Sequence, residues 1–260
     1  MLGGNPTILP IDFEPRDTGV HDVRRAFIEV QSNATRSAMP NQIIFCGDPH
    51  GCFANVIRAV HKYRPDAVIL LGDYNLELPL ENYLKTIIGI TKIYWIPGNH
   101  DFDSVAEFEN LYYSALSYNN IHLKVIEVAG LRIAGLGGIF KEAIWMPPDP
   151  PKWLDKKQGS HCKPSNVKKM SLHLDHAIWH PEFEKMKRTV RADILVTHEA
   201  PGCHRHGKKA IDKLAEAIGA KKIFHGHHHN YYQDAVKGIA VTGVAIGGIT
   251  NLAGEQLMKR

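Results

Sequence analysis

The sequence predicts an α/β protein in which two sheets face each other and helices cover their outer sides. Short apolar runs rich in β-branched residues alternate with helical patterns, which is typical of a substantially parallel sheet. Two other segments have the pattern of hairpins, and these require antiparallel strands. No apolar run approaches the roughly 18 residues of a membrane-spanning helix, so no membrane partner is expected.

Buried strands are expected where the chain is short, apolar and β-branched, at residues 42–46, 67–71, 92–96, 193–196 and 222–224. Apolar residues fall on one helical face in residues 54–63, 80–88, 104–116 and 210–219. The last of these helices is expected to end at Gly219, since glycine is common just after a helix. The two hairpins are expected at residues 123–136 and 231–244, each turning at a glycine.

The chain is expected to form one domain of residues 41–260 behind an N-terminal arm of residues 1–40. The arm has weak periodicity and several turn formers, so loose packing is expected, with one short element around 23–30. Residues 141–170 break the pattern with proline, lysine and tryptophan. A loop this long inside a compact domain is interpreted as an insertion or lid.

The chain of 260 residues carries a net charge of +4 and a pI of about 8.8. This mild basicity suits an anionic substrate but does not by itself indicate nucleic acid. The four cysteines, Cys46, Cys52, Cys162 and Cys203, lack the spacing of a zinc knuckle. Free thiols are the favoured interpretation, with a disulfide as the open alternative. The start of the chain lacks a secretory pattern, so a cytoplasmic location is expected.

Polar residues directly follow every predicted strand, where ligands of α/β sheets bind. Imidazole nitrogen and carboxylate oxygen suit Zn, Fe and Mn. Seven candidate ligands exceed the needs of one ion and suit two ions that share a carboxylate. They are Asp48, His50, Asp73, Asn99, His198, His227 and His229. His228 is left out, because alternate side chains of an extended segment point in opposite directions.

The ordered motifs D-x-H, G-D, G-N-H-D, H and G-H-x-H, from Gly47 to His229, resemble the calcineurin-like metallophosphoesterase superfamily. The resemblance implies a four-layer α/β/β/α sandwich of two mixed sheets flanked by helices. It implies two divalent or trivalent metal ions, with Mn favoured and Fe and Zn as alternatives. Asp48, His50 and His229 would hold the first ion, Asn99, His198 and His227 the second, and Asp73 would bridge them. His100 and Asp101 would be a catalytic acid pair beside the metals.

The second motif departs from the family pattern. Many members have a second aspartate there, whereas here Gly72-Asp73 is followed by Tyr74-Asn75-Leu76. The phosphoprotein phosphatase branch has an arginine just after this motif, where this chain has Glu77-Leu78. Our hypothesis is that Arg205, Lys208 or Lys209 replaces this arginine in binding phosphate.

The favoured function is hydrolysis of a phosphomonoester by a metal-bridging hydroxide. His100 would assist the leaving group, and Asp101 would hold the tautomer of His100. A phosphodiesterase acting on nucleotides or nucleic-acid ends is the first alternative, because the same motifs serve both reactions. A non-enzymatic scaffold is the second, and the complete ligand set argues against it.

A phosphorylated substrate is the expected partner, and its identity and the oligomeric state are left open. Nucleic acid is less favoured. The lysines of residues 141–170, with Trp145 and Trp153, could contact it, but a solvated loop with anchoring aromatic residues is the commoner arrangement. The isolated histidines are interpreted as structural, with His173, His176 and His180 on a solvated or capping helix face. The others are His61, His122 and His161.

Overall fold

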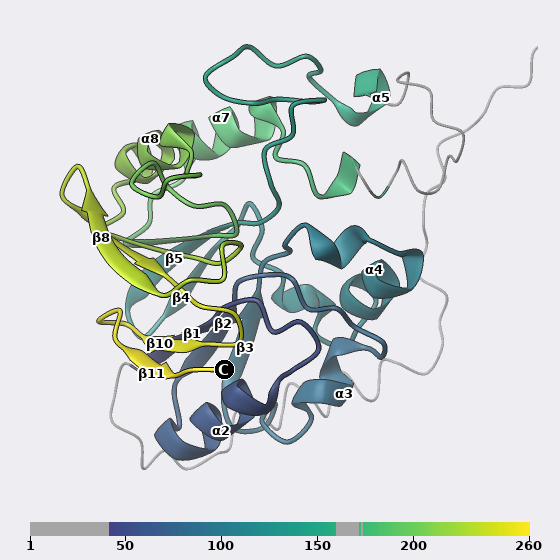
Figure 1. Ribbon diagram of the computed structural model, residues 1–260, viewed down its shortest axis with the longest axis vertical. Helices are drawn as coiled ribbons and strands as arrows, with labels where there is room; N and C mark the ends of the chain where they lie inside the picture. The colour runs from purple at the N-terminus through teal and green to yellow at the C-terminus, as the bar shows by residue number, and fades with distance from the viewer. Residues whose placement is uncertain (1–41, 160–171, 173) are drawn as a thin grey trace, which may run out of the picture.

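The computed structural model describes residues 42–159, 172 and 174–260 (Figure 1). The predicted N-terminal arm, with its element around 23–30, lies outside the described residues. So do His161, Cys162, His173 and the part of the predicted insertion from residue 160 to 170.

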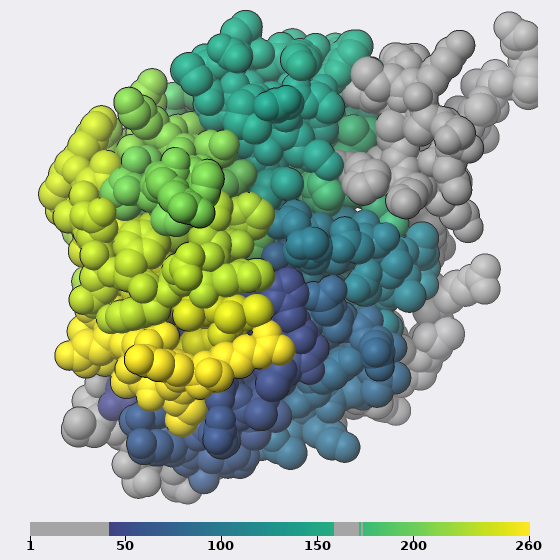
Figure 2. Space-filling model, viewed as in Figure 1, coloured from purple at the N-terminus to yellow at the C-terminus, as the bar shows by residue number. Residues whose placement is uncertain are grey.

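The first sheet has the strand order β11-β10-β1-β2-β3. Its parallel strands β1 (Ile43–Cys46), β2 (Ala67–Leu70) and β3 (Lys92–Trp95) confirm three of the predicted strands. The antiparallel strands β10 (Ile249–Asn251) and β11 (Gln256–Met258) were not predicted, because three residues are too few for a periodic pattern. Figure 2 shows this C-terminal segment, in yellow, against the purple and blue residues of the first sheet's half.

The second sheet has the strand order β4-β5-β6-β7-β9-β8 and contains both predicted hairpins. Its strands are β4 (Val125–Val128), β5 (Leu131–Leu136), β6 (Ile194–Thr197), β7 (Lys222–His225), β8 (Tyr232–Val236) and β9 (Ile239–Gly243). The turn residues Ala129-Gly130 and Lys237-Gly238 all have positive φ. Two consecutive positive φ angles are the geometry that suits the twist of a two-residue hairpin.

Helices cover the outer face of each sheet (Figure 1). The first sheet carries α2 (Ala54–Tyr63), α3 (Leu80–Leu84) and α4 (Val105–Tyr112), and the second carries α7 (His180–Thr189) and α8 (Lys209–Ile218). Short helical segments are α5 (Lys156–Gly159) and the 3₁₀ helices η1 (His100–Phe102) and η2 (Ser117–Asn119). Gly219 ends α8 with φ 81°, as predicted. Helix α7 was not predicted.

Alternation of side chains along the strands produces separate apolar layers. Ile44 and Cys46 of β1 pack under the helices of the first sheet, whereas Ile43 and Phe45 face the second sheet. The Phe45 ring stacks on the Phe224 ring of β7, with centroids 3.7 Å apart and an interplanar angle of 9°. The four-layer α/β/β/α sandwich of two mixed sheets is therefore confirmed.

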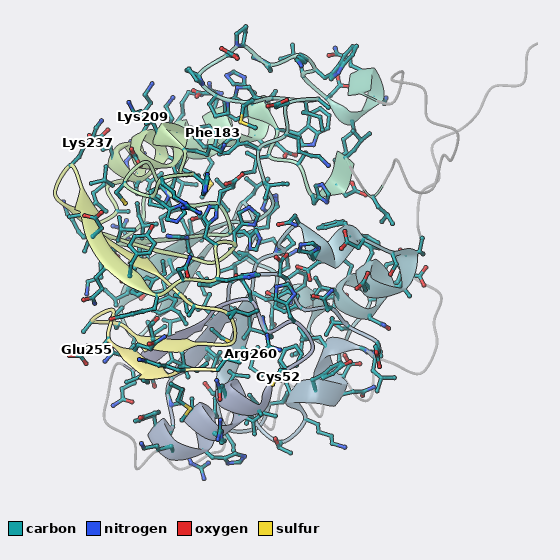
Figure 3. All side chains as sticks on the ribbon, viewed as in Figure 1. Cys52, Phe183, Lys209, Lys237, Glu255 and Arg260 are labelled. Atoms are coloured by element: carbon teal, nitrogen blue, oxygen red, sulfur yellow. The ribbon has the colours of Figure 1, made fainter. Side chains whose placement is uncertain are left out.

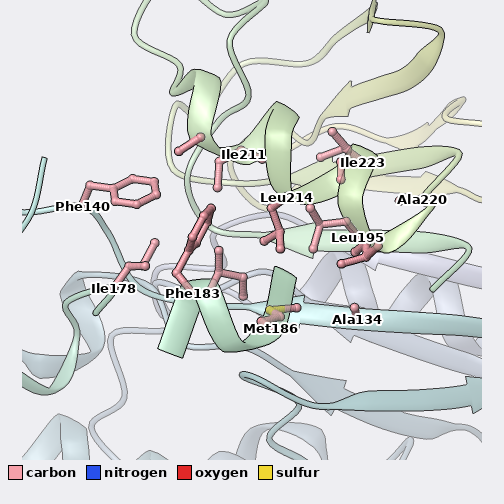
Figure 4. Packing of buried hydrophobic residues seen from close by; sticks show 14 of the residues in the cluster. Ala134, Phe140, Ile178, Phe183, Met186, Leu195, Ile211, Leu214, Ala220 and Ile223 are labelled. Atoms are coloured by element: carbon pink, nitrogen blue, oxygen red, sulfur yellow. The ribbon is translucent and has the colours of Figure 1, made fainter. Parts of the chain in front are cut away.

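The outer layer of the second sheet packs against α7 and α8. Phe183 of α7 and Leu214 of α8 lie over Leu195 and Ile223 of the sheet (Figure 4). At the edge of this layer, the Nζ of Lys237 lies 2.6 Å from a carboxylate oxygen of Glu216 in α8. Lys237 therefore connects the β8–β9 turn to that helix (Figure 3).

The expectation of a solvated helix face at residues 173–180 is wrong for the residues that are described. The His176 side chain is 5% exposed, its ring packs edge-on to Phe102, and its Nε2 lies 2.6 Å from the Nζ of Lys141. The apolar residues 177–179 are buried in the outer core, which draws the neighbouring histidine inward.

Trp145 is buried in the same core beside Phe140, so it anchors the start of the predicted insertion instead of offering a free ring face. Cys46, Cys52 and Cys203 are free thiols. Among the described residues, no helix is long and apolar enough to span a membrane.

Candidate metal centre

The seven predicted ligands lie on loops that follow β1, β2, β3, β6 and β7. Five of the seven have positive φ angles although none is glycine: Asp48, His50, Asp73, His227 and His229. Such backbone conformations are strained for ordinary residues and gather at functional sites. The loops therefore hold these side chains in orientations that a relaxed backbone would not give.

Asp73 occupies the middle of the centre. Its carboxylate lies within 4.8 Å of ligand atoms of His50 and His229, and equally of ligand atoms of His198 and His227. These are two separate groups with one carboxylate in common. That is the arrangement a bridging ligand between two ions requires.

Asp48 is a buried carboxylate without a hydrogen-bond partner for either oxygen in the described part of the chain. Its Oδ2 lies 3.6 Å from Nε2 of His229, and its Oδ1 lies 3.8 Å from Nδ1 of His198. Burial raises the pKa of Asp48 to about 7, with His198 acting in the opposite direction. Leaving a buried carboxylate unpaired is costly, and a cation at this position would remove the cost.

His198 is fully buried and has the surroundings of a metal ligand. Its Nδ1 lies 2.7 Å from the carbonyl oxygen of Leu71, and its Nε2 lies 3.1 Å from Oδ1 of Asn99 and 3.4 Å from Oδ2 of Asp73. In the tautomer that donates Nδ1–H to the carbonyl, the Nε2 lone pair faces these oxygens. A histidine that binds a metal through one ring nitrogen typically donates a hydrogen bond from the other, as His198 does here.

Without a cation, a protonated His198 and an ionised Asp73 would satisfy the same contacts by forming an ion pair. Burial lowers the pKa of His198, but Asp73 and Asp48 together raise it to about 10. Burial raises the pKa of Asp73, but the adjacent His198 brings it well below its usual range. The donor set therefore fits either an imidazolium–carboxylate pair or a cation shared among Asn99, His198 and Asp73.

Asn75, two residues after Asp73, supports His50. The Nδ1 of His50 is hydrogen-bonded to Oδ1 of Asn75, and the Asn75 amide nitrogen donates to Glu107 at 3.3 Å. An amide oxygen can only accept, so Nδ1 of His50 carries the proton and its Nε2 has the lone pair. That Nε2 lies 3.1 Å from Nε2 of His229. This role of Asn75 was not predicted.

The predicted pairing of Asp101 with His100 is wrong. Both carboxylate oxygens of Asp101 are bound by backbone N–H groups, from Asp73 at 3.0 Å, Tyr74 at 2.7 Å and Gly98 at 2.7 Å. Asp103 pairs with His100 instead, since its Oδ2 lies 2.6 Å from Nδ1 of His100. Asp101 therefore fixes the loops that carry the ligands, and Asp103 orients the histidine.

Two glycines allow the loops to approach the carboxylates. A Cβ atom at Gly98 would lie 2.1 Å from Oδ1 of Asp73, and one at Gly226 would lie 2.4 Å from Oδ1 of Asp48. Both distances are far inside van der Waals contact. Only glycine fits at these positions while the carboxylates keep their places.

A third group of ligand atoms was not predicted. Glu199, His227 and His228 place one ligand atom each within 4.8 Å of one another. Glu199 directly follows His198 and is 4% exposed, and burial raises the pKa of its carboxyl group. The run of three consecutive histidines was the available signal, although alternation of side chains argued against His228.

The basic loop between β6 and α8, residues 203–209, lies beside the centre. The ring of His204 in this loop stacks on that of His228, with centroids 4.1 Å apart, and His206 lies 5.8 Å from the same ring. Lys208 is close enough to Glu199 to lower the pKa of that carboxyl group, against the larger effect of burial. The role of Arg205, Lys208 or Lys209 in binding phosphate stays a prediction.

Comparison with known proteins agrees with this architecture. The chain is 33% identical over 223 residues to an uncharacterized protein of Haemophilus influenzae, covering 84% of this chain and 96% of that one. Its fold is similar to that of TT1561 of Thermus thermophilus, with a TM-score of 0.54 at 13% identity, over 84% of this chain and 97% of that one.

A family model described as calcineurin-like phosphoesterase matches residues 42–231. The matched span contains every predicted metal ligand, from Asp48 to His229. The chain therefore belongs to the calcineurin-like phosphoesterase family, whose members are metal-dependent.

Proposed function

We propose that the protein is a phosphomonoesterase that works with two transition-metal ions, Mn being the favoured one. The observation that carries the proposal is that Asp73 belongs to two ligand groups that share no other residue. When bound, such a pair of cations activates a water for attack and neutralises phosphoryl oxygens. The protein's own part is to hold the ligands, position the substrate and deliver a proton.

The ligand set controls the charge of the centre. Asp48 and Asp73 bring two negative charges, and Asn99 adds a neutral oxygen. The remaining ligands are imidazoles, which bind metals in their neutral form. Two divalent ions would therefore keep an excess of positive charge, which attracts a phosphate dianion.

His100 is the proposed donor to the leaving alkoxide. Its side chain is 46% exposed, so substrate can reach it, and its backbone N–H donates to Oδ1 of Asp73 at 2.9 Å. Burial lowers the pKa of His100, but the hydrogen bond to Asp103 and the negative charges of Asp73 and Asp103 together raise it above its usual value. The raised pKa increases the share of the imidazolium form, which can give up a proton as the P–O bond breaks.

The basic loop of residues 203–209 supports a monoester over a diester. A monoester carries a second negative charge on its phosphate, and Lys208 adds positive charge on the side of the centre where Glu199 lies. A diester would instead need an open flank for its second alcohol. The positive charge beside the centre therefore favours monoesters as a class.

The test is hydrolysis of 4-nitrophenyl phosphate beside bis(4-nitrophenyl) phosphate, with Mn²⁺ added and then removed by a chelator. We expect Mn-dependent turnover that is faster on the monoester. Asp73→Asn purified in the same way should be inactive, which excludes a contaminating phosphatase. Faster cleavage of the diester would replace the proposal with a phosphodiesterase, and no turnover of either would favour a scaffold.

A further inference from the structure

Glu199, His227 and His228 lie together on the side of the centre that faces the basic loop of residues 203–209. We propose that these three side chains form an additional cation site of the zinc-binding type, separate from the two ions that share Asp73. This proposal concerns a site that the phosphoesterase reaction does not need.

The donor atoms are of the types found in a three-ligand zinc site. One carboxylate and two imidazoles form a known donor set for zinc, with bonds of about 2.0–2.2 Å and a further position open. Ligand atoms around a tetrahedral ion with such bonds are therefore roughly 3.3–3.6 Å apart. The three ligand atoms here lie within 4.8 Å of one another, so they would draw together by about 1 Å to close on an ion.

The side chain of His228 is separate evidence that a cation binds here. Its Nε2 is buried and has no hydrogen-bond partner among the described residues. The ring is sandwiched in place, stacked on His204 at 4.1 Å with an interplanar angle of 21° and edge-on to His227 at 4.7 Å. Leaving a buried nitrogen unpaired costs free energy, and the packed ring cannot turn freely to reach water.

Glu199 is held so that part of its carboxylate remains available. Its Oε1 accepts the backbone N–H of Phe140 at 3.0 Å, and the described residues offer its carboxylate no other hydrogen bond. The residue is 4% exposed, so its carboxylate has little contact with bulk water. A buried carboxylate within 4.8 Å of a ring nitrogen of His228 is suited to a cation between them.

The additional ion should be the most weakly held of the bound ions. It shares only His227 with the groups around Asp73, so one ring nitrogen of His227 would bind each ion and the imidazole would give up its N–H proton. Apart from that imidazolate, Glu199 is its one anionic ligand. Repulsion from the neighbouring ion lowers its affinity further, because like charges at short range interact strongly inside a protein. We therefore expect it to bind last and to leave first when a chelator is added.

Equilibrium dialysis against Zn²⁺, with zinc counted per chain by mass spectrometry, tests the site. We compare the intact chain with Glu199→Gln, whose amide oxygen can still accept from Phe140, and with His228→Ala. His61→Ala is the matched control, since His61 is exposed on α2. Each site variant should bind one zinc ion fewer than the intact chain, and the control should bind the same number. With Co²⁺ in place of Zn²⁺, the same variants should lose the absorption contributed by the last ion to bind.

Equal zinc content in the intact chain and both variants would overturn the site. Loss of more than one ion would also overturn it, because Glu199 and His228 would then act only by orienting His227 for the main centre. Asp73→Asn separates this inference from the proposed function. If the main centre is wrong, Asp73→Asn keeps its zinc, while the deficit of one ion in Glu199→Gln remains.

Discussion

The two sheets contribute to the candidate centre in different ways. Loops after the first sheet's strands supply both carboxylates, and hydrogen bonds tie these loops together: Asp101 alone accepts three backbone N–H groups. Loops after the second sheet's strands supply imidazoles that pack on one another. The ring of His227 lies 4.8 Å from that of His198 and 4.7 Å from that of His228.

This contrast separates two tasks. The first sheet fixes where negative charge sits, since backbone hydrogen bonds tolerate little displacement of the loops that carry it. The second sheet supplies neutral donors whose positions depend on ring packing. Replacing the shared carboxylate of the first sheet should therefore release both ions, whereas replacing His198 of the second sheet should release one.

Comparing Asp73→Asn with His198→Asn tests most directly whether the two sheets hold the ions in different ways. Asp73 belongs to both ligand groups, so its replacement should empty both positions and reduce turnover by roughly a thousandfold or more. His198 belongs to one group only, so its replacement should release one ion. Metal counting by mass spectrometry gives the answer, and loss of the same number of ions from both variants would refute the bridging role.

His100→Asn should reduce turnover by about 10²–10⁴-fold on substrates with poor leaving groups. Much less effect is expected with 4-nitrophenol, whose anion leaves without a proton. Metal content should not change, because His100 is not a ligand. The two substrates are compared at saturating Mn²⁺, and metal loss from the variant would contradict the assigned role.

Asn75→Ala should weaken the ion held by His50 by roughly 10–100-fold, the usual effect of losing the group that orients a metal ligand. The other ion should keep its affinity. Competition with a metal-sensitive dye measures both affinities, and Asn82→Ala on the exposed face of α3 is the matched control. An equal loss at both ions would mean that Asn75 supports the fold and not His50 alone.

Asp103→Asn should have the smallest effect, a shift of the pH profile. The hydrogen bond to Asp103 raises the pKa of His100, so the active imidazolium is present at low pH and is lost as pH rises through that pKa. Removing the negative charge lowers the pKa, so the alkaline limb of turnover should move to lower pH. An unmoved limb would show that Asp103 does not govern the protonation of His100.

The positions of the ligands could be predicted from the sequence because parallel strands end at one edge of a sheet. Each loop follows a buried strand, so knowing the strands was enough to bring Asp48 and Asp73 to one edge of the first sheet, and His198 and His227 to one edge of the second. The hairpins were equally clear, since their turns contain the glycines that positive φ angles favour.

Other features depend on contacts that leave no periodic pattern. The partner of His100 was misassigned because a neighbour in sequence is not a neighbour in space: in a 3₁₀ turn, side chains three residues apart lie on one face, which selects Asp103 over Asp101. His176 was misplaced because the burial of residues 177–179 is decided by the second sheet's outer layer.

The stacked rings of Phe45 and Phe224 have a consequence beyond stability. The sheets that carry the carboxylates and the imidazoles share no strand pairing, so the thickness of the layer between them sets how far apart these ligands stand. Substituting a bulkier or slimmer side chain at either ring would move one set of ligands relative to the other. Metal preference could thus be retuned from the interior of the protein, with every coordinating residue left as it is.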